Sequence, residues 1–284
     1  MSYCLYEVDK EKRIARLTFN KPEKLHAKTE EDIQETIERL QEAEQDDNVS
    51  VIILSGTGRC YGAGRDIDEV RSGRQFDKGR PSLRTRYAGL KSHWGRRGVL
   101  QQILKCDKVT ISQVHGYCYG GHFEYMVASD LAVASEDAQF THPGYTYLGI
   151  EGPIPLYVLM IGWRKTKEMM LLGKGLSAQE ALEFGLVNKV VPREKLEESV
   201  NEWAEIIAQR PIDSMVMGKK EFDLAIDMMG VSAGYDLASF HHTCASNLKF
   251  EEGEFNLMKE LRDRGRKGMY AARDTGLKDP LRKE

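Results

Sequence analysis

The chain has 284 residues, of which 41% are hydrophobic, so it is long enough to bury a substantial core. Its formal net charge of −3 gives no reason to expect nucleic acid or a membrane surface as a partner, and no apolar run approaches the roughly 18 residues of a transmembrane helix. Five cysteines with neither metal spacing nor a disulfide framework, together with an N-terminus that has no export-signal pattern, favour a soluble cytoplasmic protein.

Strand and helix patterns alternate over the first two hundred residues, which predicts an α/β fold. Two strands are expected over Cys4–Val8 and Ile14–Phe19, and a helix is expected to open at Thr29, where Asp32 stands in a capping-box-like position. Further strands and helices then recur in chain order: strands over Val51–Leu54 and Val109–Val114, a helix over Gly121–Ser129, a strand over Leu131–Ala134, and helices over Leu156–Gly162 and Ala178–Phe184.

The C-terminal third is predicted to be helical. Strand patterns stop after Val190-Val191, and four helical patterns follow, over Glu197–Gln209, Ile212–Ile226, Ser232–Leu248 and Glu254–Arg264. This shift predicts a core of residues 1–200 and a helical region of residues 201–284.

The run His115–Glu124 follows a predicted strand and contains Gly120-Gly121 at the start of a predicted helix. The first N–H groups of a helix lack partners within the helix and lie at the positive end of its dipole, so they suit an anion or a developing oxyanion. Glu124 would stand one turn into the helix, close to anything held there. The alternative is an ordinary strand-to-helix turn with an acid near the helix start.

A second glycine-rich stretch, Ser55–Ile67, follows the strand at Val51–Leu54. It does not fit the dinucleotide pattern G-x-G-x-x-G, because Tyr61 occupies the place of the third glycine, and no G-K-[ST] sequence forms a P-loop. The stretch is therefore a turn whose backbone can approach a ligand closely, and we expect it to face the amides of Gly120-Gly121.

The segment Asp68–Gly98 is rich in lysine and arginine and ends near His93-Trp94. Two interpretations fit this pattern: a surface that receives a polyanionic ligand, or a solvated loop.

Four stretches in this order resemble the crotonase superfamily, also called the enoyl-CoA hydratase/isomerase family, nearly end to end. Asn20–Ala27 is similar to its N-terminal coenzyme A-binding turn, Gly62–Ile67 to its first oxyanion loop, Gly116–Glu124 to its second, and Ala178–Val191 to the segment that ends its core. The resemblance implies a spiral of repeated ββα units followed by a helical trimerisation region, and hence a homotrimer or a hexamer.

The resemblance also implies the ligand and its contacts. The substrate would be an acyl-CoA thioester, with no cofactor besides its coenzyme A moiety. The backbone N–H groups of Arg65 and Gly121 would form the oxyanion hole, and the Arg65 side chain need not take part. Residues of two segments would bind coenzyme A: Lys24, Leu25, Ala27, Ala63, Asp66 and Ile67.

One catalytic position departs from the hydratase pattern. Hydratases of this family hold a water between two glutamates, and Glu124 matches the first of them. The second position is Gly144, at the end of Phe140–Gly144. Here the chain resembles dihydroxynaphthoyl-CoA synthases and ketocyclohexanecarboxyl-CoA hydrolases, in which an acid follows seven residues later; that acid would be Glu151. Those enzymes have no counterpart of Glu124, so the site combines two patterns.

Several residues are candidates for the missing acid–base group or for the acyl pocket: Glu151, His142, Tyr145, Tyr147 and His122. Each of these residues also has a purely structural interpretation. Glu151 would be a charge before the start of a helix, and the other four would be packing residues. No metal site is expected, because the histidines do not have metal-ligand spacing.

The sequence predicts an enzyme that stabilises a thioester enolate, of the type that adds water to, or removes it from, an acyl-CoA double bond. Glu124 would position the water, and Glu151 would handle the α-carbon proton. Gly144 motivates two alternatives, a carbon–carbon bond hydrolase that opens a cyclic β-keto acyl-CoA and an enoyl-CoA isomerase. A non-catalytic acyl-CoA binder is the further alternative.

Overall fold

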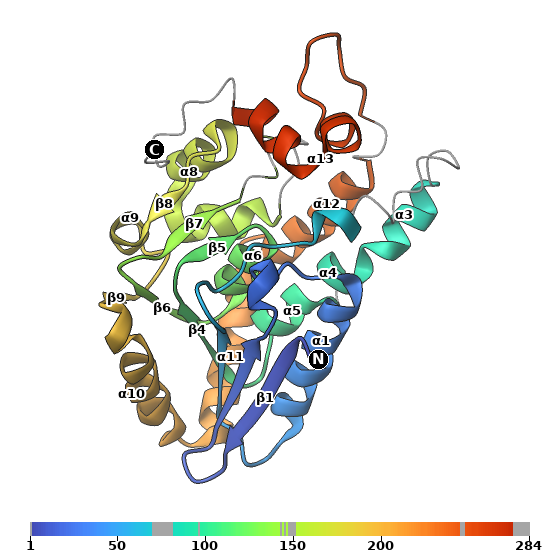
Figure 1. The fold of residues 1–284 in the computed structure, drawn as a ribbon. Coiled ribbons are helices and arrows are strands. Elements are labelled where there is room, and N and C mark those ends of the chain that lie inside the picture. The colour runs from blue at the N-terminus through green and yellow to red at the C-terminus, as the bar shows by residue number, and fades with distance from the viewer. Residues whose placement is uncertain are drawn as a thin grey trace.

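The computed structural model describes residues 2–69, 82–95, 97–142, 144, 146, 152–244 and 248–274. Within these residues the fold is α/β, with two sheets surrounded by helices (Figure 1). The larger sheet has the order β1-β2-β3-β4-β6-β9, in which β1 is antiparallel to β2 and the other pairs are parallel. Its strands are β1 (Cys4–Asp9), β2 (Ile14–Phe19), β3 (Val51–Gly56), β4 (Val109–Val114), β6 (Leu131–Ser135) and β9 (Lys189–Val191).

A second sheet of three short strands lies beside the first, in the order β5 (Tyr117–Tyr119), β7 (Gln139–Thr141) and β8 (Leu176–Ser177). Strand β5 pairs in parallel with β7, and β7 pairs antiparallel with β8. The central strands of the larger sheet are buried along nearly their whole length, as expected for parallel strands that helices cover on both faces.

One face of the larger sheet packs against α1 (Glu30–Gln45), α5 (Val99–Leu104) and α6 (Gly121–Ala128), which share the main hydrophobic core. The predicted start of α1 is confirmed: Thr29 is its N-cap, and a capping box joins Thr29 and Asp32. Ile33, Ile37 and Leu40 bury the inner face of this helix.

The opposite face of the sheet is covered by α10 (Leu196–Ala208), whose buried side chains repeat at helical spacing. They pack against sheet residues in a second core cluster: Leu196, Val200, Ala204 and Ala208 against Ile14, Val51, Ile53, Ile111 and Val133. The expected boundary at residue 200 falls inside this helix, and the division into two regions stays a prediction.

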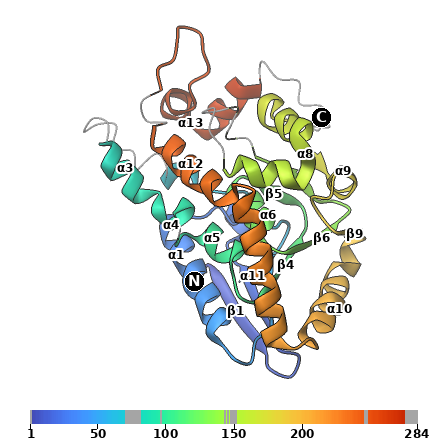
Figure 2. The same ribbon diagram turned by 180° about the vertical axis from the view of Figure 1, so that it is seen from behind.

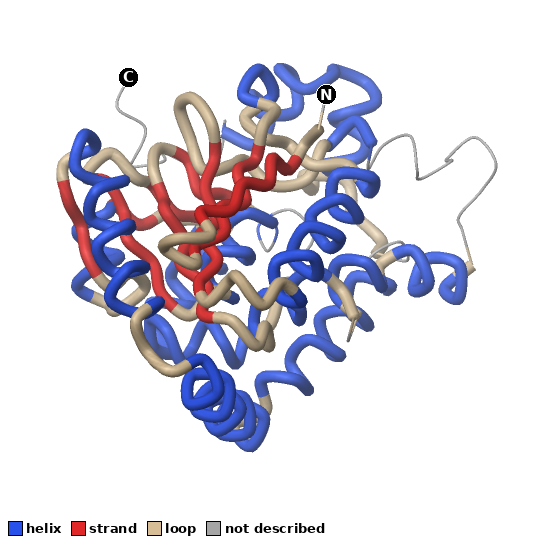
Figure 3. Tube along the Cα trace, turned by 90° about the horizontal axis from the view of Figure 1, so that it is seen from below, coloured by secondary structure: helices blue, strands red, loops and turns tan. Residues whose placement is uncertain are grey.

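The other helices whose bounds the structure describes lie around the sheets (Figures 2 and 3). They are α3 (Leu83–Gly89), α4 (Lys91–Trp94), α8 (Ile154–Leu172), α9 (Ala178–Glu183), α11 (Ile212–Met228), α12 (Val231–Cys244), α13 (Leu257–Asp274) and the 3-10 turns η1 (Pro22–Lys24) and η3 (Arg193–Lys195). The helix predicted over Leu156–Gly162 is longer than expected, because the chain resumes helical geometry beyond Gly162, whose own φ is 75°. No helix in the described ranges is long and apolar enough to cross a membrane.

Candidate active site

The two glycine-rich loops meet at the start of α6. The N–H of Gly62 donates to the carbonyl of Tyr117 at 2.8 Å, and the N–H of Tyr119 donates back to Gly62 at 2.9 Å, so the first loop pairs with β5. Gly64 then lies directly against the second loop, since a Cβ added to it would stand 3.1 Å from the Gly121 nitrogen. The φ of Gly64 is +97°, a value that also favours glycine.

Most backbone N–H groups around this junction are bonded within the protein. The N–H of Asp66 donates to the Lys28 carbonyl at 2.9 Å, and the N–H of Gly120 donates to the Thr141 carbonyl at 3.0 Å. In the part of the chain that the structure describes, none of these backbone bonds uses the N–H of Arg65 or of Gly121. The structure thus brings the loop that contains Arg65 against the loop that contains Gly121, and the role of the two N–H groups stays a prediction.

His122 supports the first loop from inside the core. It is fully buried, its Nδ1 accepts from the Gly64 N–H at 3.0 Å, and its Nε2 lies 2.9 Å from the Tyr3 hydroxyl. Because Nδ1 accepts, Nε2 carries the proton and donates to that hydroxyl, which in turn donates to the His26 carbonyl at 3.0 Å. Its expected role as an acyl-pocket residue does not fit this position, because both ring nitrogens hold the protein together.

Glu124 lies on the first turn of α6 and is held by two histidines. Its Oε2 accepts from Nε2 of His93 at 2.7 Å, and its Oε1 accepts from Nε2 of His142 at 3.0 Å. Glu124 and His93 are almost completely buried, whereas the side chain of His142 is 10% exposed. The three side chains come from α6, α4 and the segment after β7, and they form one hydrogen-bonded group.

Burial by itself raises the pKa of Glu124, but the charge that His142 and His93 carry when they are protonated, together with their hydrogen bonds, outweighs burial and holds that pKa below its usual range. Burial lowers the pKa of His93 to about 4, although the nearby carboxylate favours its charged form. At neutral pH Glu124 is therefore a carboxylate and His93 a neutral imidazole that donates its Nε2 proton. In that tautomer Nδ1 is the basic nitrogen of the ring.

His93 is a site residue that the sequence did not identify as one. It was visible beside Trp94 at the end of the basic segment, but nothing in its spacing linked it to a glutamate 31 residues later. In the described residues 82–95 this segment forms α3 and α4, so the expectation of a solvated loop is wrong for that part. The short helix α4 is what carries His93 to Glu124.

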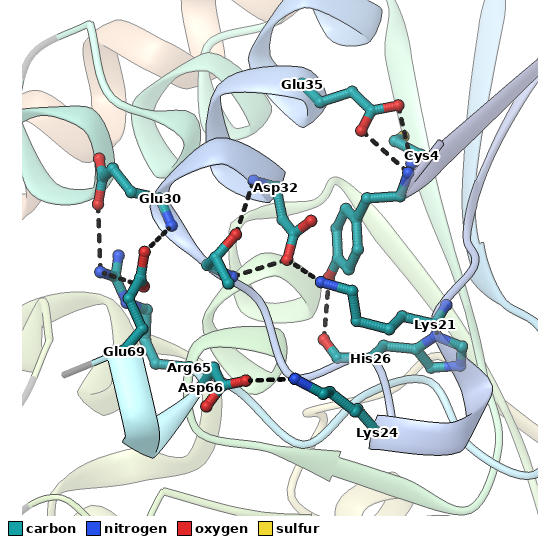
Figure 4. Close-up of polar contacts among 12 residues, drawn as sticks. Cys4, Lys21, Lys24, His26, Glu30, Asp32, Glu35, Arg65, Asp66 and Glu69 are labelled. Carbon is teal, nitrogen blue, oxygen red and sulfur yellow. Dashed lines mark hydrogen bonds and ion pairs between the residues drawn. The ribbon is translucent and has the colours of Figure 1, made fainter. Parts of the chain in front are cut away.

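The expected coenzyme A segments also lie side by side, as Figure 4 shows. The N–H of Ala63 donates to the Leu25 carbonyl at 2.9 Å, and the N–H of Lys28 donates to the Gly64 carbonyl at 2.9 Å. Leu25 and His26 both have positive φ values, 53° and 57°, which turn the chain tightly here. Residues 24–28 and 63–66 therefore form one continuous edge, with Ala27 between the two bonded positions.

The charged side chains of this edge are paired. The exposed Lys24 ammonium lies 3.3 Å from Asp66, and the Arg65 guanidinium lies 3.1 Å from Glu30 and 3.6 Å from Glu69 (Figure 4). The Arg65 side chain is thus engaged with acids of its surroundings. Ile67 packs against Leu261 and Met269 of α13.

Three candidates, Glu151, Tyr145 and Tyr147, lie outside the described residues. Gly144 is described, and a glycine offers no side chain for proton transfer. Among the residues described, no cluster of histidine, cysteine or acidic side chains is arranged to hold a metal ion. The five cysteines are unpaired thiols, and four of them are buried.

The sequence is similar to those of known proteins. The sequence profile of the enoyl-CoA hydratase/isomerase family matches residues 9–263. EchA13 of Mycobacterium tuberculosis, named as an enoyl-CoA hydratase, is 32% identical over 82% of this chain and 77% of its own. A 4-chlorobenzoyl coenzyme A dehalogenase of an Arthrobacter species is 30% identical over 70% of each chain.

Solved structures show the same fold. The crystal structure of an enoyl-CoA hydratase/isomerase from Xanthobacter autotrophicus Py2 is 26% identical and superimposes with a TM-score of 0.80, covering 97% of this chain and 98% of its own. The matching profile spans both glycine loops, Glu124 and the helices that follow. The chain belongs to the enoyl-CoA hydratase/isomerase family.

Proposed function

We propose that this chain stabilises the enolate of an acyl-CoA thioester, with the N–H groups of Arg65 and Gly121 as the oxyanion hole. The observation that carries this proposal is the contact of the two loops at the start of α6. Around it the N–H groups of Ala63, Gly64, Asp66 and Gly120 are bonded within the protein, and no bond among the described residues uses those of Arg65 and Gly121. Each preorganised donor of this kind typically lowers a barrier by roughly 2.7–4 kcal/mol. Residues 24–28 and 63–67 are the proposed coenzyme A edge.

The reaction we propose is hydration of a double bond conjugated to the thioester, or the reverse dehydration. Each oxygen of Glu124 accepts one histidine N–H and keeps a second lone pair, which we assign to the water that attacks the β-carbon. The histidines hold the carboxylate ionised and fixed in direction. Glu151 remains the proposed donor of the α-carbon proton. Positioned acid–base groups of this kind are worth about 10²–10⁴-fold in rate.

A panel of enoyl-CoA thioesters tests the hydratase proposal. Hydration removes the conjugation between the double bond and the thioester, so the absorbance of the conjugated thioester should fall. If no thioester in a panel that varies chain length and ring substitution loses this absorbance, the hydratase assignment is wrong.

Gly144 favours a second candidate, a carbon–carbon bond hydrolase or an isomerase acting on a cyclic or branched acyl-CoA. The hydratases of the family have a carboxylate at this position, and here the position has no side chain. Mass spectrometry of a cyclic β-keto acyl-CoA after incubation separates the possibilities: ring opening adds the mass of one water, whereas isomerisation leaves the mass unchanged.

The homotrimer or hexamer expected from the resemblance is also a proposal. Large apolar side chains are exposed on α11 and α12, among them Met217, Phe222, Met228, Leu237 and Phe240. Such a surface suits contact with another subunit. Light scattering of the purified chain would measure the mass, and a monomer would contradict the proposal.

A further inference from the structure

Lys28 lies between the two loops that meet at the proposed oxyanion hole. Its N–H donates to the Gly64 carbonyl, and its own carbonyl accepts from the Asp66 N–H, both at 2.9 Å. These two bonds bracket Arg65, so the backbone of Lys28 is fixed beside the first proposed oxyanion donor.

The Lys28 side chain reaches the second loop. It is fully buried, its Nζ donates to the Gly121 carbonyl at 2.6 Å, and the same nitrogen stands 3.3 Å from the centroid of the Tyr125 ring. A Cβ added to Gly121 would lie 2.7 Å from Nζ. With standard bond geometry this places Nζ within about 5 Å of the Gly121 nitrogen.

The surroundings of Lys28 disfavour a positive charge. Burial lowers its pKa well below the usual value, and the nearby Arg65 lowers it further. Glu124 is the main acid that favours the charged form, and both of its oxygens are bonded to histidines instead. The other polar groups of this environment are Cys118, His93, His122 and Tyr125.

A cation is also unfavourable at the N-terminal end of a helix, where the dipole is positive. The charged form of Lys28 is therefore unfavourable at this place. Such a cost is typical of a site where charge changes during a reaction.

We propose that Lys28 is a positioning residue of the oxyanion hole: it holds Gly121 in place, and its positively charged form, which burial disfavours, is favoured once the neighbouring thioester oxygen becomes negative in the enolate. The inference rests on the proposed function, because it needs an enolate at Arg65 and Gly121. It adds to the two amides a lysine side chain that can carry a positive charge and that comes from outside both loops. A nearby opposite charge typically lowers the pKa of an acid by about 1–3 units.

Acetoacetyl-CoA tests this inference, because it is a stable thioester whose enolate has its own near-ultraviolet absorption. It loses a C2 proton to buffer, and the electron pair is delocalised onto the thioester oxygen. The purified full-length protein is titrated with this compound over a range of pH, and calorimetry measures total binding. The spectra give the apparent pKa of the bound compound.

Three substitutions of Lys28 separate the effect of its positive charge from the effect of its hydrogen bond to Gly121. Lys28→Met removes both, Lys28→Gln retains an N–H donor for the Gly121 carbonyl without the charge, and Lys28→Arg retains the charge. We expect Lys28→Met and Lys28→Gln to reduce enolate formation by about tenfold or more with total binding changed by less than about threefold, and Lys28→Arg to stay close to wild type. Lys12→Met, which removes an exposed lysine, is the matched control for the loss of one positive charge and should have no effect.

The outcomes are distinct. If Lys28→Gln forms as much enolate as the wild type, Lys28 acts only through its hydrogen bond and the inference is overturned, while the proposed function stands. If the wild type binds acetoacetyl-CoA and forms no enolate, both the proposed function and this inference are wrong. Should Lys28→Met fail to fold, Lys28→Gln gives the same decision.

Discussion

The arrangement of Glu124 between His93 and His142 makes the substitution Glu124→Gln informative, because the change is nearly isosteric. A glutamine has one oxygen that accepts and one NH₂ group that donates, whereas both carboxylate oxygens of Glu124 accept from a histidine Nε2–H. In the variant, one histidine N–H faces another donor, and that histidine must move its proton to Nδ1 or lose the bond.

The magnitude follows from these two bonds. Hydrogen bonds to a charged group contribute about 1.5–3 kcal/mol each, against about 0.5–1.5 kcal/mol for neutral pairs. The lowered pKa of Glu124 indicates that the histidines outweigh the cost of burying its charge. We therefore expect the free energy of unfolding to fall by about 1–3 kcal/mol, and turnover of an active enoyl-CoA to fall by about 10²–10⁴-fold.

Urea denaturation measures the first effect, and steady-state kinetics on the best substrate of the panel measures the second. Glu205→Gln is the matched control, because that acid pairs with Lys12 at the surface, and we expect a change within about 0.5 kcal/mol. Retention of more than about a tenth of the turnover by Glu124→Gln would show that this carboxylate does not take part in the chemistry. An unchanged unfolding free energy would refute the reasoning about the two bonds.

Three further predictions concern stability and the first loop. Burial lowers the pKa values of His93, His115 and His242 from 6.5 to about 4, so the unfolded chain takes up protons first as the pH falls. Their contribution to stability is thus present above pH 6.5 and is lost between 6.5 and 4; urea denaturation at several pH values should show it, and His115→Gln should lessen the slope. Gly64→Ala should lower turnover and cost about 1–3 kcal/mol, because its φ is +97° and the new Cβ would stand 3.1 Å from the second loop; unchanged kinetics would contradict the loop contact. Thr29→Ala should cost about 1 kcal/mol in thermal or urea unfolding, because it removes the capping box of α1, and no change would show that the box is not needed.

Local patterns predicted the elements well where the residues themselves determine the backbone. The strand at Val109–Val114 agrees in both bounds because its apolar residues are buried in a parallel sheet, and the start of α1 agrees because the capping box is a local signal. Helix α8 was predicted too short, since Gly162 interrupts the apolar pattern without ending the helix.

The site could be predicted only in part, for a physical reason. The contact of the two loops follows from glycine patterns at strand ends, and the structure brings these loops together. His93 and Lys28 reach the site through tertiary contacts, which leave no periodic mark in the sequence. A lysine and a histidine in polar stretches indicate solvent exposure when they are considered alone.

The two glycine-rich loops and His93 are held by different parts of the fold, and this affects which residues can be substituted independently of one another. The two glycine-rich loops are held by backbone bonds to β5 and by the buried ring of His122. His93, in contrast, belongs to α4, a helix of only four residues. Substitutions in residues 82–95 can therefore alter the surroundings of Glu124 while the loops that carry the proposed oxyanion amides stay in place. Laboratory evolution toward a new acyl group should collect its mutations there and leave Gly62, Gly64 and Gly120 untouched.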